Sequence, residues 1–468
     1  MKKTKIICSI GPSSSGADIM EQMARVGMDV ARINCSHASV EEKQKVVETV
    51  KLIRQKVNKN IAILYDLKGP EFRNGVLEND QVNLVNGATI RIVKENVVGN
   101  ETRFSVNHPQ VLDHLNVGNT IFLENGLMKI EVISKESDGV TCRVISGGVL
   151  GSRKSLSCPE IKLDIPYVST QDREDTIHAC THDADYLALS FVTCRQDILD
   201  IKSILKEQGR EDLKLICKIE NGDGVENLAE ILDESEGIMV ARGDLGTEVN
   251  METIPLIQKQ MIKSARELGK IAIVATEMLE SMKNSARPTR AEISDVANAV
   301  LDGTDAVMLS GESTVGKYPV ETVKIMADIC LATEKHADYY KLFKYTQKIG
   351  VTQTIANAVV NSTDMLKAKL IVAATESGFT ARKISNLKPK PLILACCPNE
   401  KVGRGLALNY GVYPVVIAEQ NTVDGVLEAS SRAARTFTNL ESGDIIIITG
   451  GFPTGISKNT NLMKIETI

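Results

Sequence analysis

Lys218 and Glu220 stand two residues apart at the end of an apolar run, in the stretch LICKIENGDGV that covers residues 215–225. Side chains two apart in a β-strand share a face, so a strand here would set the two charges side by side. In a parallel barrel the chemistry lies at the carboxyl ends of the strands, and both residues come at such an end. For these two residues alone, a buried structural ion pair is the alternative.

Most other apolar runs also end in polar residues. Three polar residues, Arg32, Asn34 and Ser36, alternate with apolar residues in and after the run at 29–35. The other polar residues end or follow the later runs: Asp66 and Lys68, Asp244, Thr276 and Glu277, and Ser310 and Glu312. We expect Thr276 and Glu277 to lie within the seventh strand. Isolated charges at a barrel mouth would be costly to desolvate unless they paired or bound a ligand. Convergence of so many polar groups therefore favours a binding site over a structural ion pair.

The residue types indicate which ligands such a mouth would bind. Glu220 and Asp244, with few soft ligands nearby in sequence, suit a hard divalent cation such as Mg²⁺ or Mn²⁺. Arginine and lysine beside them suit a phosphate whose charge the metal also neutralises. Asn34, Ser36 and Asp66 offer oxygen ligands with a single negative charge, which fits a monovalent ion or a hydroxyl network. Phosphoryl transfer is the reaction class that needs this mixture without an obvious covalent nucleophile.

Eight short β-branched runs, with helical patterns between them, must position these groups. They cover residues 5–11, 29–35, 61–67, 186–191, 213–220, 237–242, 271–278 and 305–312. Parallel strands need crossover helices, so the alternation predicts an α/β fold with a (β/α)8 TIM barrel. The long gap after the third run, residues 69–164, alternates in polarity and predicts an inserted antiparallel β domain. From about residue 341, further runs predict a C-terminal open α/β sheet.

Composition sets limits on the class of protein. A chain of 468 residues exceeds one hydrophobic core, and we expect roughly three domains. Its 55 basic and 60 acidic residues, without long like-charge blocks, argue against nucleic acid or a membrane surface as a partner. No stretch approaches the roughly 20 apolar residues of a membrane span, and the first apolar run is too short for a signal peptide. Ten scattered cysteines without metal-ligand spacing predict reduced thiols in a cytoplasmic protein.

Four long stretches resemble the pyruvate kinase family, and the likeness runs from about residue 4 to the C-terminus. They are MDVARINCSH at 28–37, YDLKGPEFRNG at 65–75, CKIENGDGVENLAEILDESEGIMVARGDLGTE at 217–248 and ATEMLESMKNSARPTRAEISDVANAVLDGTDAVMLSGES at 275–313. The resemblance implies a barrel A domain in two parts, 1–68 and 165–340, with a mobile β-barrel lid, the B domain, inserted at 69–164. It also implies a regulatory C domain at 341–468 and a homotetramer. The implied glycolytic reaction transfers phosphate from phosphoenolpyruvate to ADP, giving pyruvate and ATP.

The resemblance further implies roles for individual residues. Lys218 matches the lysine that stabilises the phosphoryl group in flight, Arg32 the arginine that holds this group, and Thr276 the threonine near the enol carbon. The backbone of Ala241, Arg242 and Gly243 matches the stretch that receives the substrate carboxylate, beside Asp244. The other implied positions are Glu220 and Asp244 for the divalent metal, Asn34, Ser36, Asp66 and the carbonyl of Leu67 for potassium, and Asn34, Cys35, Ser36, His37, Arg73 and Lys154 for the nucleotide.

Some residues depart from the family pattern. Leu67 stands where threonine is common, but the family's ligand there is a backbone oxygen, so potassium binding should survive. Glu71 matches the glutamate of potassium-dependent members, which implies activation by K⁺. Glu277 replaces a usual glutamine and Thr193 a usual arginine. The added negative charge of Glu277 is expected to weaken phosphoenolpyruvate binding.

A second anion-site candidate lies in the C-terminal third, where an apolar strand runs into Thr375, Ser377, Gly378 and Thr380. Hydroxyls and free N–H groups at a helix start can bind an anion, although ordinary helix capping is the alternative. This loop resembles the family's sugar-phosphate effector site, with GGFPTG at 450–455 as its partner loop. Activation by a phosphorylated sugar is therefore expected.

The stretch GESTVGKY at 311–318 is close to a phosphate-binding P-loop pattern. Tyr318 stands where the pattern needs the Mg²⁺-binding hydroxyl of Ser or Thr, and Pro319 follows it. A loop after the eighth strand is the better interpretation.

Two other function classes compete with a kinase. A barrel-strand lysine can attack a ketone, as in a Schiff-base aldolase, but adjacent carboxylates would keep Lys218 protonated and a poor nucleophile. A catalytically inactive regulatory protein is the third class, and the presence of every matched ligand argues against it.

Overall fold

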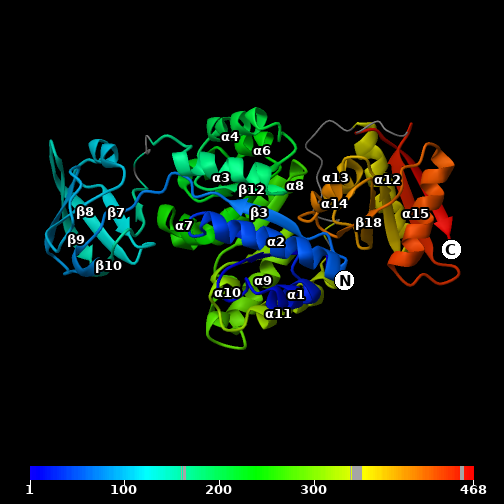
Figure 1. Ribbon diagram of the computed structural model, residues 1–468, viewed down its shortest axis with the longest axis horizontal. Coiled ribbons are helices and arrows are strands. Elements are labelled where there is room, and N and C mark those ends of the chain that lie inside the picture. Colours follow the sequence, from blue (N-terminus) through cyan, green and yellow to red (C-terminus); the bar gives the residue numbers. More distant parts are fainter. Residues whose placement is uncertain (160, 162–164, 338, 340–349, 454–457) are drawn as a thin grey trace.

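Eight parallel strands close into a barrel in the order β1-β16-β15-β14-β13-β12-β3-β2. The barrel lies at the centre of Figure 1. The computed structural model describes residues 1–159, 161, 165–337, 339, 350–453 and 458–468. The barrel strands are β1 (Lys5–Ser9), β2 (Val30–Asn34), β3 (Ala62–Asp66), β12 (Tyr186–Leu189), β13 (Lys214–Ile219), β14 (Gly237–Ala241), β15 (Ile271–Ala275) and β16 (Ala306–Leu309). All eight expected strands are present, which confirms the predicted barrel.

The seventh strand ends earlier than expected. Thr276 and Glu277 were expected inside it, but β15 ends at Ala275, and both residues adopt left-handed backbone angles, φ 68° and 53°. This conformation is costly for non-glycine residues, above all for a β-branched threonine. The chain therefore turns sharply away from the barrel directly after Ala275.

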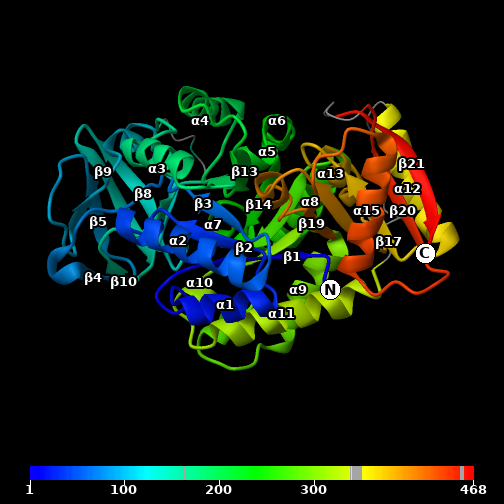
Figure 2. The ribbon, with the colours of Figure 1, turned by 45° about the vertical axis from the view of Figure 1, so that its right-hand side comes forward.

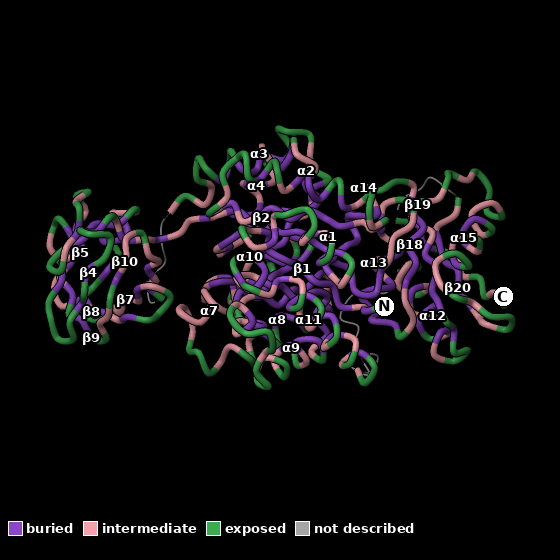
Figure 3. Tube along the Cα trace, turned by 60° about the horizontal axis from the view of Figure 1, so that its bottom comes forward, coloured by how far each residue is buried: buried purple, intermediate pink, exposed green. Residues whose placement is uncertain are grey.

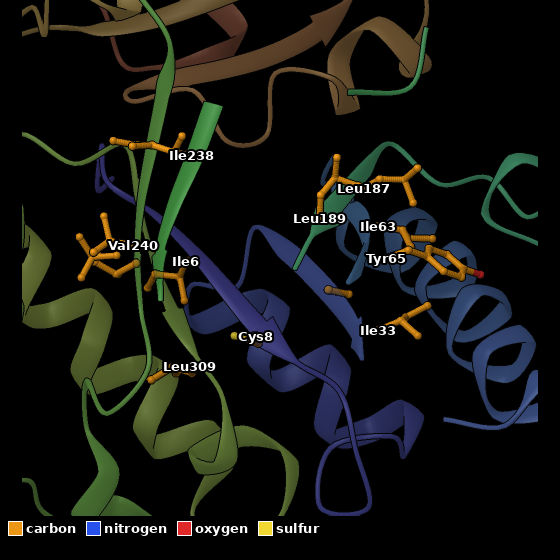
Figure 4. Packing of buried hydrophobic residues seen from close by; sticks show 14 of the residues in the cluster. Ile6, Cys8, Ile33, Ile63, Tyr65, Leu187, Leu189, Ile238, Val240 and Leu309 are labelled. Carbon is orange, nitrogen blue, oxygen red and sulfur yellow. The ribbon is translucent and has the colours of Figure 1, made fainter. Parts of the chain in front are cut away.

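Helices surround the barrel and cover its outer face. They are α1 (Ala17–Val26), α2 (Val40–Val57), α3 (Thr170–Thr181), α4 (Arg195–Glu207), α5 (Gly222–Glu226), α6 (Leu228–Glu234), α7 (Arg242–Glu248), α8 (Ile254–Glu267), α9 (Arg290–Asp302), α10 (Gly311–Thr314) and α11 (Pro319–Glu334), with 3-10 turns at Met251–Thr253 and Glu280–Lys283. Alternate strand residues such as Ile6, Ile63 and Val240 point outward into this layer and are fully buried, as Figure 4 shows. Helix starts are fixed locally: Ser39 caps α2 by accepting from the Glu42 amide at 3.2 Å.

The strand residues that alternate with these outward-facing ones point inward and fill the barrel interior. Residues such as Val30, Leu64 and Ile216 form a separate buried cluster inside the ring of strands. Ala407 and Leu408 of the C-terminal domain belong to the same cluster, with exposed fractions of 4% and 0%. The C-terminal domain therefore closes the amino-terminal end of the barrel, and the open mouth lies at the carboxyl ends of the strands.

The inserted segment forms the small β domain at the left of Figure 1. Its strands are β4 (Gln81–Leu84), β5 (Thr89–Val93), β6 (Arg103–Ser105), β7 (Thr120–Leu123), β8 (Met128–Glu136), β9 (Gly139–Ser146), β10 (Gly148–Gly151) and β11 (Leu156–Ser157), with 3-10 turns at Glu78–Asp80 and Pro109–Asp113. They pair in a six-stranded sheet, β11-β7-β8-β9-β5-β6, and a two-stranded sheet, β10-β4. Every pair is antiparallel, as expected, except β5 with β6. Ser157 contacts the barrel by donating to the Thr247 carbonyl at 3.2 Å.

The C-terminal domain is an open sheet in the order β19-β18-β17-β20-β21, with helices on both sides, as Figure 2 shows. Its elements are α12 (Val351–Leu366), β17 (Leu370–Ala374), α13 (Phe379–Ser385), β18 (Leu392–Cys397), α14 (Glu400–Arg404), β19 (Val412–Val416), α15 (Val423–Phe437), β20 (Ile445–Gly451) and β21 (Thr460–Thr467). The predicted α/β sheet is confirmed, and the antiparallel edge strand β21 is an addition to it. Figure 3 shows buried residues in the inserted β domain, the barrel and this domain, and each of the three has a buried cluster of its own.

Among the helices that the structure describes, none has both the length and the apolar character needed to cross a membrane.

Candidate active site

The ammonium group of Lys218 is held by three neighbours at the barrel mouth. Its Nζ lies 3.0 Å from Glu220 Oε1 and 3.2 Å from Asp66 Oδ1, and it donates to Ser190 Oγ at 2.7 Å. Burial lowers the pKa of Lys218, but the carboxylates of Asp66 and Glu220 outweigh burial, so the net pKa is raised. The side chain is therefore a fixed cation, with 12% of its surface exposed.

Glu220 is almost completely buried beside this lysine, with a residue exposure of 1%. Burial raises the pKa of Glu220, Lys218 lowers it and the nearby charge of Asp244 raises it, so the net pKa is about 7. Its Oε2 accepts a hydrogen bond from the Phe191 amide at 2.7 Å. Within the described residues, Oε1 pairs with Lys218 but receives no hydrogen bond. This oxygen is therefore available for a further ligand.

Asp66 lies between two cations. Arg32 Nε donates to its Oδ2 at 2.6 Å, while Lys218 approaches Oδ1. Burial raises the pKa of Asp66, but Arg32 and Lys218 outweigh it and hold the pKa below its usual value. Arg32 is fixed a second time, because its Nη1 donates to Ser9 Oγ at 2.7 Å.

Strand alternation explains why these side chains meet. On three strands, an apolar residue that faces the interior is followed, two residues on, by a polar residue of the site: Leu64 by Asp66, Ile216 by Lys218 and Ala188 by Ser190. The barrel interior thus continues upward as a polar layer at the carboxyl ends. The predicted shared face of Lys218 and Glu220 is observed.

The stretch after β14 forms a second wall of the mouth. Ala241 ends the strand and α7 begins at Arg242. The Gly243 amide donates to Thr276 Oγ1 at 2.9 Å, and Arg242 Nη2 donates to the Thr276 carbonyl at 2.7 Å. The left-handed conformation of Thr276 costs about 1–3 kcal/mol, and these contacts hold it.

Comparison with known proteins agrees with this geometry. A family model described as "Pyruvate kinase, barrel domain" matches residues 1–323, and one described as "Pyruvate kinase, alpha/beta domain" matches residues 353–466. The chain belongs to the pyruvate kinase family. It is therefore a phosphotransferase enzyme.

Individual relatives cover the whole chain. Pyruvate kinase of Staphylococcus epidermidis is 40% identical over 473 positions, which span 100% of this chain and 81% of the relative. Pyruvate kinase of Geobacillus stearothermophilus is 40% identical and is covered to 80%. Among solved structures, a pyruvate kinase from Cryptosporidium parvum superposes with a TM-score of 0.94 at 36% identity, covering 100% of this chain and 96% of the other.

The residues expected to bind potassium cluster at the ends of two adjacent strands. Register pairs Asn34 of β2 directly with Asp66 of β3. Asn34 Oδ1 accepts from the Ser36 amide at 3.1 Å, and the Leu67 carbonyl accepts from Ser190 Oγ at 2.7 Å. These groups lie close together and present oxygen atoms.

A divalent cation also fits the residues present. Within the described part of the chain, no cluster of three or more His, Cys, Asp or Glu side chains could enclose a metal. Asp244 lies near enough to Glu220 to raise the pKa of that carboxyl, and Glu220 Oε1 receives no hydrogen bond from a described residue, so these two carboxylates would hold the cation and leave its other positions open. Mg²⁺ is commonly bound in this open manner.

Two cations expected at the nucleotide are already paired within the inserted β domain. Arg73 makes a two-pronged contact with Glu71, at 2.7 and 2.6 Å, and Lys154 Nζ lies 2.8 Å from Glu124 Oε1. His37 is exposed, whereas Cys35 is buried in the outer core. The Cys35 side chain therefore points away from the barrel mouth.

Other mouth residues have structural contacts. Glu312 is fully buried, and its carboxylate accepts from the backbone amides of Leu279 and Ser310 at 3.1 and 2.8 Å. It thus ties two loops together instead of facing a ligand, contrary to the expectation from sequence. Glu277 is exposed, and Thr193 hydrogen-bonds the Asp197 carboxylate near the start of α4.

Ser190 and Ser9 were missed by sequence reasoning, although each holds a charged site residue. Both sit in apolar runs and therefore read as ordinary strand positions. Their spacing from interior residues could have revealed them, because residues two or four positions apart in a strand share a face. Ser190 shares a strand face with Tyr186 and Ala188, and Ser9 shares one with Ile7. Both faces point into the barrel.

The loop that was expected from sequence to bind an effector borders a pocket of about 230 Å³ in the C-terminal domain. Thr375, Ser377 and Thr380 line it, whereas Gly378 turns the chain with a φ of 77°. Thr380 Oγ1 already contacts Thr460 Oγ1 at 2.8 Å. Gly451, Phe452 and Lys458 line the opposite side, and residues 454–455 of the expected partner loop lie outside the described residues.

Proposed function

We propose that this chain transfers the phosphoryl group of phosphoenolpyruvate to ADP, with Mg²⁺ (or Mn²⁺) and K⁺ as cofactors. The observation that carries this proposal is the surroundings of Lys218, a cation within 3.2 Å of two buried carboxylates, Glu220 and Asp66. Cations and hard oxygen ligands meeting at one point, without a covalent nucleophile, are what phosphoryl transfer requires.

In this mechanism Lys218 donates to the phosphoryl oxygens as the group moves from donor to acceptor. Arg32 binds the same group from the other side of Asp66. The backbone of Ala241, Arg242 and Gly243 receives the substrate carboxylate, and Thr276 lies beside the enol carbon. Arg32 is already held by Asp66 and Ser9 before substrate arrives, so its side chain needs little reorganisation in the transition state.

Glu220 and Asp244 would hold the divalent cation, which supplies neutralisation of phosphate charge when bound. The oxygen of Glu220 that lacks a hydrogen bond supports this role. Asn34, Ser36, Asp66 and the Leu67 carbonyl would hold K⁺, and the identity of Glu71 supports a potassium requirement.

ADP would bind between the lid and the barrel, at Asn34 through His37, Arg73 and Lys154. Arg73 lies near enough to Asp244 for that carboxylate to contribute to its raised pKa, after the larger effect of Glu71. Arg73 therefore stands between the lid and the proposed metal site. When the nucleotide binds, phosphate oxygens replace Glu71 as its partner, and closure of the lid excludes water.

We also propose regulation by a phosphorylated sugar at Thr375, Ser377, Gly378 and Thr380, supported by the pocket that three of these residues line. Titration of the rate at low phosphoenolpyruvate with a panel of sugar phosphates tests it. We expect at least one to lower the half-saturating phosphoenolpyruvate concentration, and a flat response to all of them would refute this regulation.

A homotetramer is the proposed assembly. Large apolar side chains are exposed on the helix surface, at Leu256 of α8 and at Ile293 and Leu301 of α9, and Ile465 is exposed on the edge strand β21. A partner subunit can cover both surfaces. Sedimentation velocity should give the mass of four chains, and a monomer at micromolar concentration would contradict the proposal.

A coupled assay for pyruvate release from phosphoenolpyruvate and ADP tests the reaction itself. Turnover should require Mg²⁺ and increase with K⁺, and absence of turnover with both ions present would refute the proposed function. Borohydride with pyruvate tests the aldolase alternative. Because the pKa of Lys218 is raised, we expect no covalent trapping at this residue.

A further inference from the structure

Ser190 joins the two halves of the mouth through one hydroxyl group. Lys218 Nζ donates to Ser190 Oγ at 2.7 Å, and Ser190 Oγ donates to the carbonyl of Leu67, also at 2.7 Å. The residue lies directly after β12, between the strand that carries Lys218 and the strand that leads to Leu67. One side chain therefore touches both the cationic centre and the carbonyl proposed to bind K⁺.

The direction of these hydrogen bonds is fixed by the groups involved. A protonated lysine can only donate, so Ser190 must accept from Lys218 and has a single proton left. This proton can go to the Leu67 carbonyl at 2.7 Å or to Asp66 Oδ1 at 3.3 Å. The shorter contact favours the carbonyl. The resulting chain runs from Lys218 through Ser190 to Leu67.

The turn that carries Ser190 is clamped from several sides. Its side chain is buried, with 2% of the residue exposed, and its carbonyl accepts from the Tyr167 hydroxyl at 3.0 Å. Gly69 packs so closely that a Cβ there would lie 2.6 Å from the Ser190 carbonyl oxygen. The next residue, Phe191, adopts a φ of 55° and donates its amide to Glu220. Ser190 therefore has little freedom to move.

We propose that Ser190 is a positioning residue that fixes the ammonium of Lys218 relative to the monovalent-cation site at Leu67. This inference rests on the function proposed above for Lys218 and Leu67. Lys218 donates one hydrogen bond, to the Ser190 hydroxyl, and forms two ion pairs, so without the hydroxyl only the carboxylates of Asp66 and Glu220 hold it. The ammonium then moves toward them, away from the phosphoryl group. The Leu67 carbonyl loses its donor at the same time and is oriented less firmly for K⁺.

The test compares Ser190→Ala with a matched control, Ser385→Ala. Ser385 is also fully buried and donates to a backbone carbonyl, that of Tyr410, at 2.8 Å, but it lies in the C-terminal domain. Assays contain no sugar phosphate. For Ser190→Ala we expect kcat to fall about 10-fold or more with KM for phosphoenolpyruvate little changed, and the half-activating K⁺ concentration to rise about 3-fold or more. Ser190→Cys, which keeps a weak donor, should fall between Ser190→Ala and the wild type.

A second measurement follows K⁺ without turnover. KCl, compared with tetramethylammonium chloride, should raise the unfolding temperature of the wild type and of Ser385→Ala, because a bound ion stabilises the folded chain. The rise should shrink in Ser190→Ala. Equal kcat and equal K⁺ responses in the two alanine variants would overturn the proposal, and so would a lower kcat with an unchanged K⁺ response. An inactive wild type would instead refute the proposed function.

Discussion

Arg404 of the C-terminal domain donates from Nε to Asp185, at the foot of β12, over 2.9 Å. Its Nη2 reaches Asp183 at 2.8 Å, and Arg54 of α2 contacts the same two aspartates. Two cations and two anions thus join the domain to the barrel at the end of the strand that leads upward to Ser190.

Replacing Arg404 with alanine should destabilise the protein substantially. The substitution leaves Asp185, which has 3% of its side chain exposed, with Arg54 as its remaining cation. Breaking a buried pair costs about 3–5 kcal/mol. Urea unfolding should therefore begin at clearly lower denaturant. The control Arg432→Ala removes an exposed arginine 3.7 Å from Glu428 and should change stability by less than about 1 kcal/mol. Equal effects of the two substitutions would contradict this assignment.

Lys218→Ala should reduce kcat about 100- to 1,000-fold, with a smaller change in KM, because the lysine acts mainly on the moving phosphoryl group. The coupled pyruvate assay measures both constants. Lys202→Ala is the control, since Lys202 is a surface lysine with 41% of its side chain exposed, paired with Glu234. A Lys218→Ala enzyme with the turnover of this control would remove the central role given to Lys218.

Glu220→Gln should weaken the response to Mg²⁺. The amide keeps the size of the side chain but removes the charge, so the Mg²⁺ concentration for half-maximal rate should rise at least about 10-fold. Direct Mn²⁺ binding, followed by electron paramagnetic resonance, should fall in parallel. Glu428→Gln, at a carboxylate with 73% exposure, serves as the matched control. Unchanged Mn²⁺ binding in Glu220→Gln would exclude this residue as a metal ligand.

Asp29 should make the protein sensitive to acid. Burial raises the pKa of Asp29, but Lys2, Lys59 and Lys5 outweigh burial and hold it well below its usual range. The unfolded carboxyl has a pKa of about 3.9, so the ionised group stabilises the fold above that pH, and the stabilisation is lost as pH falls toward the folded pKa.

Unfolding temperatures of the wild type and Asp29→Asn should therefore differ most at neutral pH and converge below about pH 4. Asp138→Asn, at an aspartate with 63% side-chain exposure beside Arg91, should follow the wild type at every pH. A constant gap between Asp29→Asn and the wild type from pH 7 to pH 3 would contradict the predicted linkage.

Strand alternation was enough to predict the barrel and the meeting of Lys218, Glu220 and Asp66. It could not reveal Ser190, because a hydroxyl within an apolar run carries no distinct pattern, and its partners lie on two other strands. The turn at Thr276 was also hidden, since its backbone angles depend on contacts with Gly243 and Arg242 that are distant in sequence. The pairing of Arg73 with Glu71 is another contact that the sequence pattern did not predict. Local pattern thus predicts which groups face the mouth, whereas tertiary contacts decide what each of them touches.

Ala407 and Leu408 close the floor of the barrel, and the Tyr186 hydroxyl donates to the neighbouring Gly405 carbonyl at 2.9 Å. The barrel therefore depends on the C-terminal domain to bury its interior. A truncated chain without its last third would expose the apolar interior of the barrel to water. A gene fusion that exchanges this last third must supply apolar residues that cover the same end of the barrel.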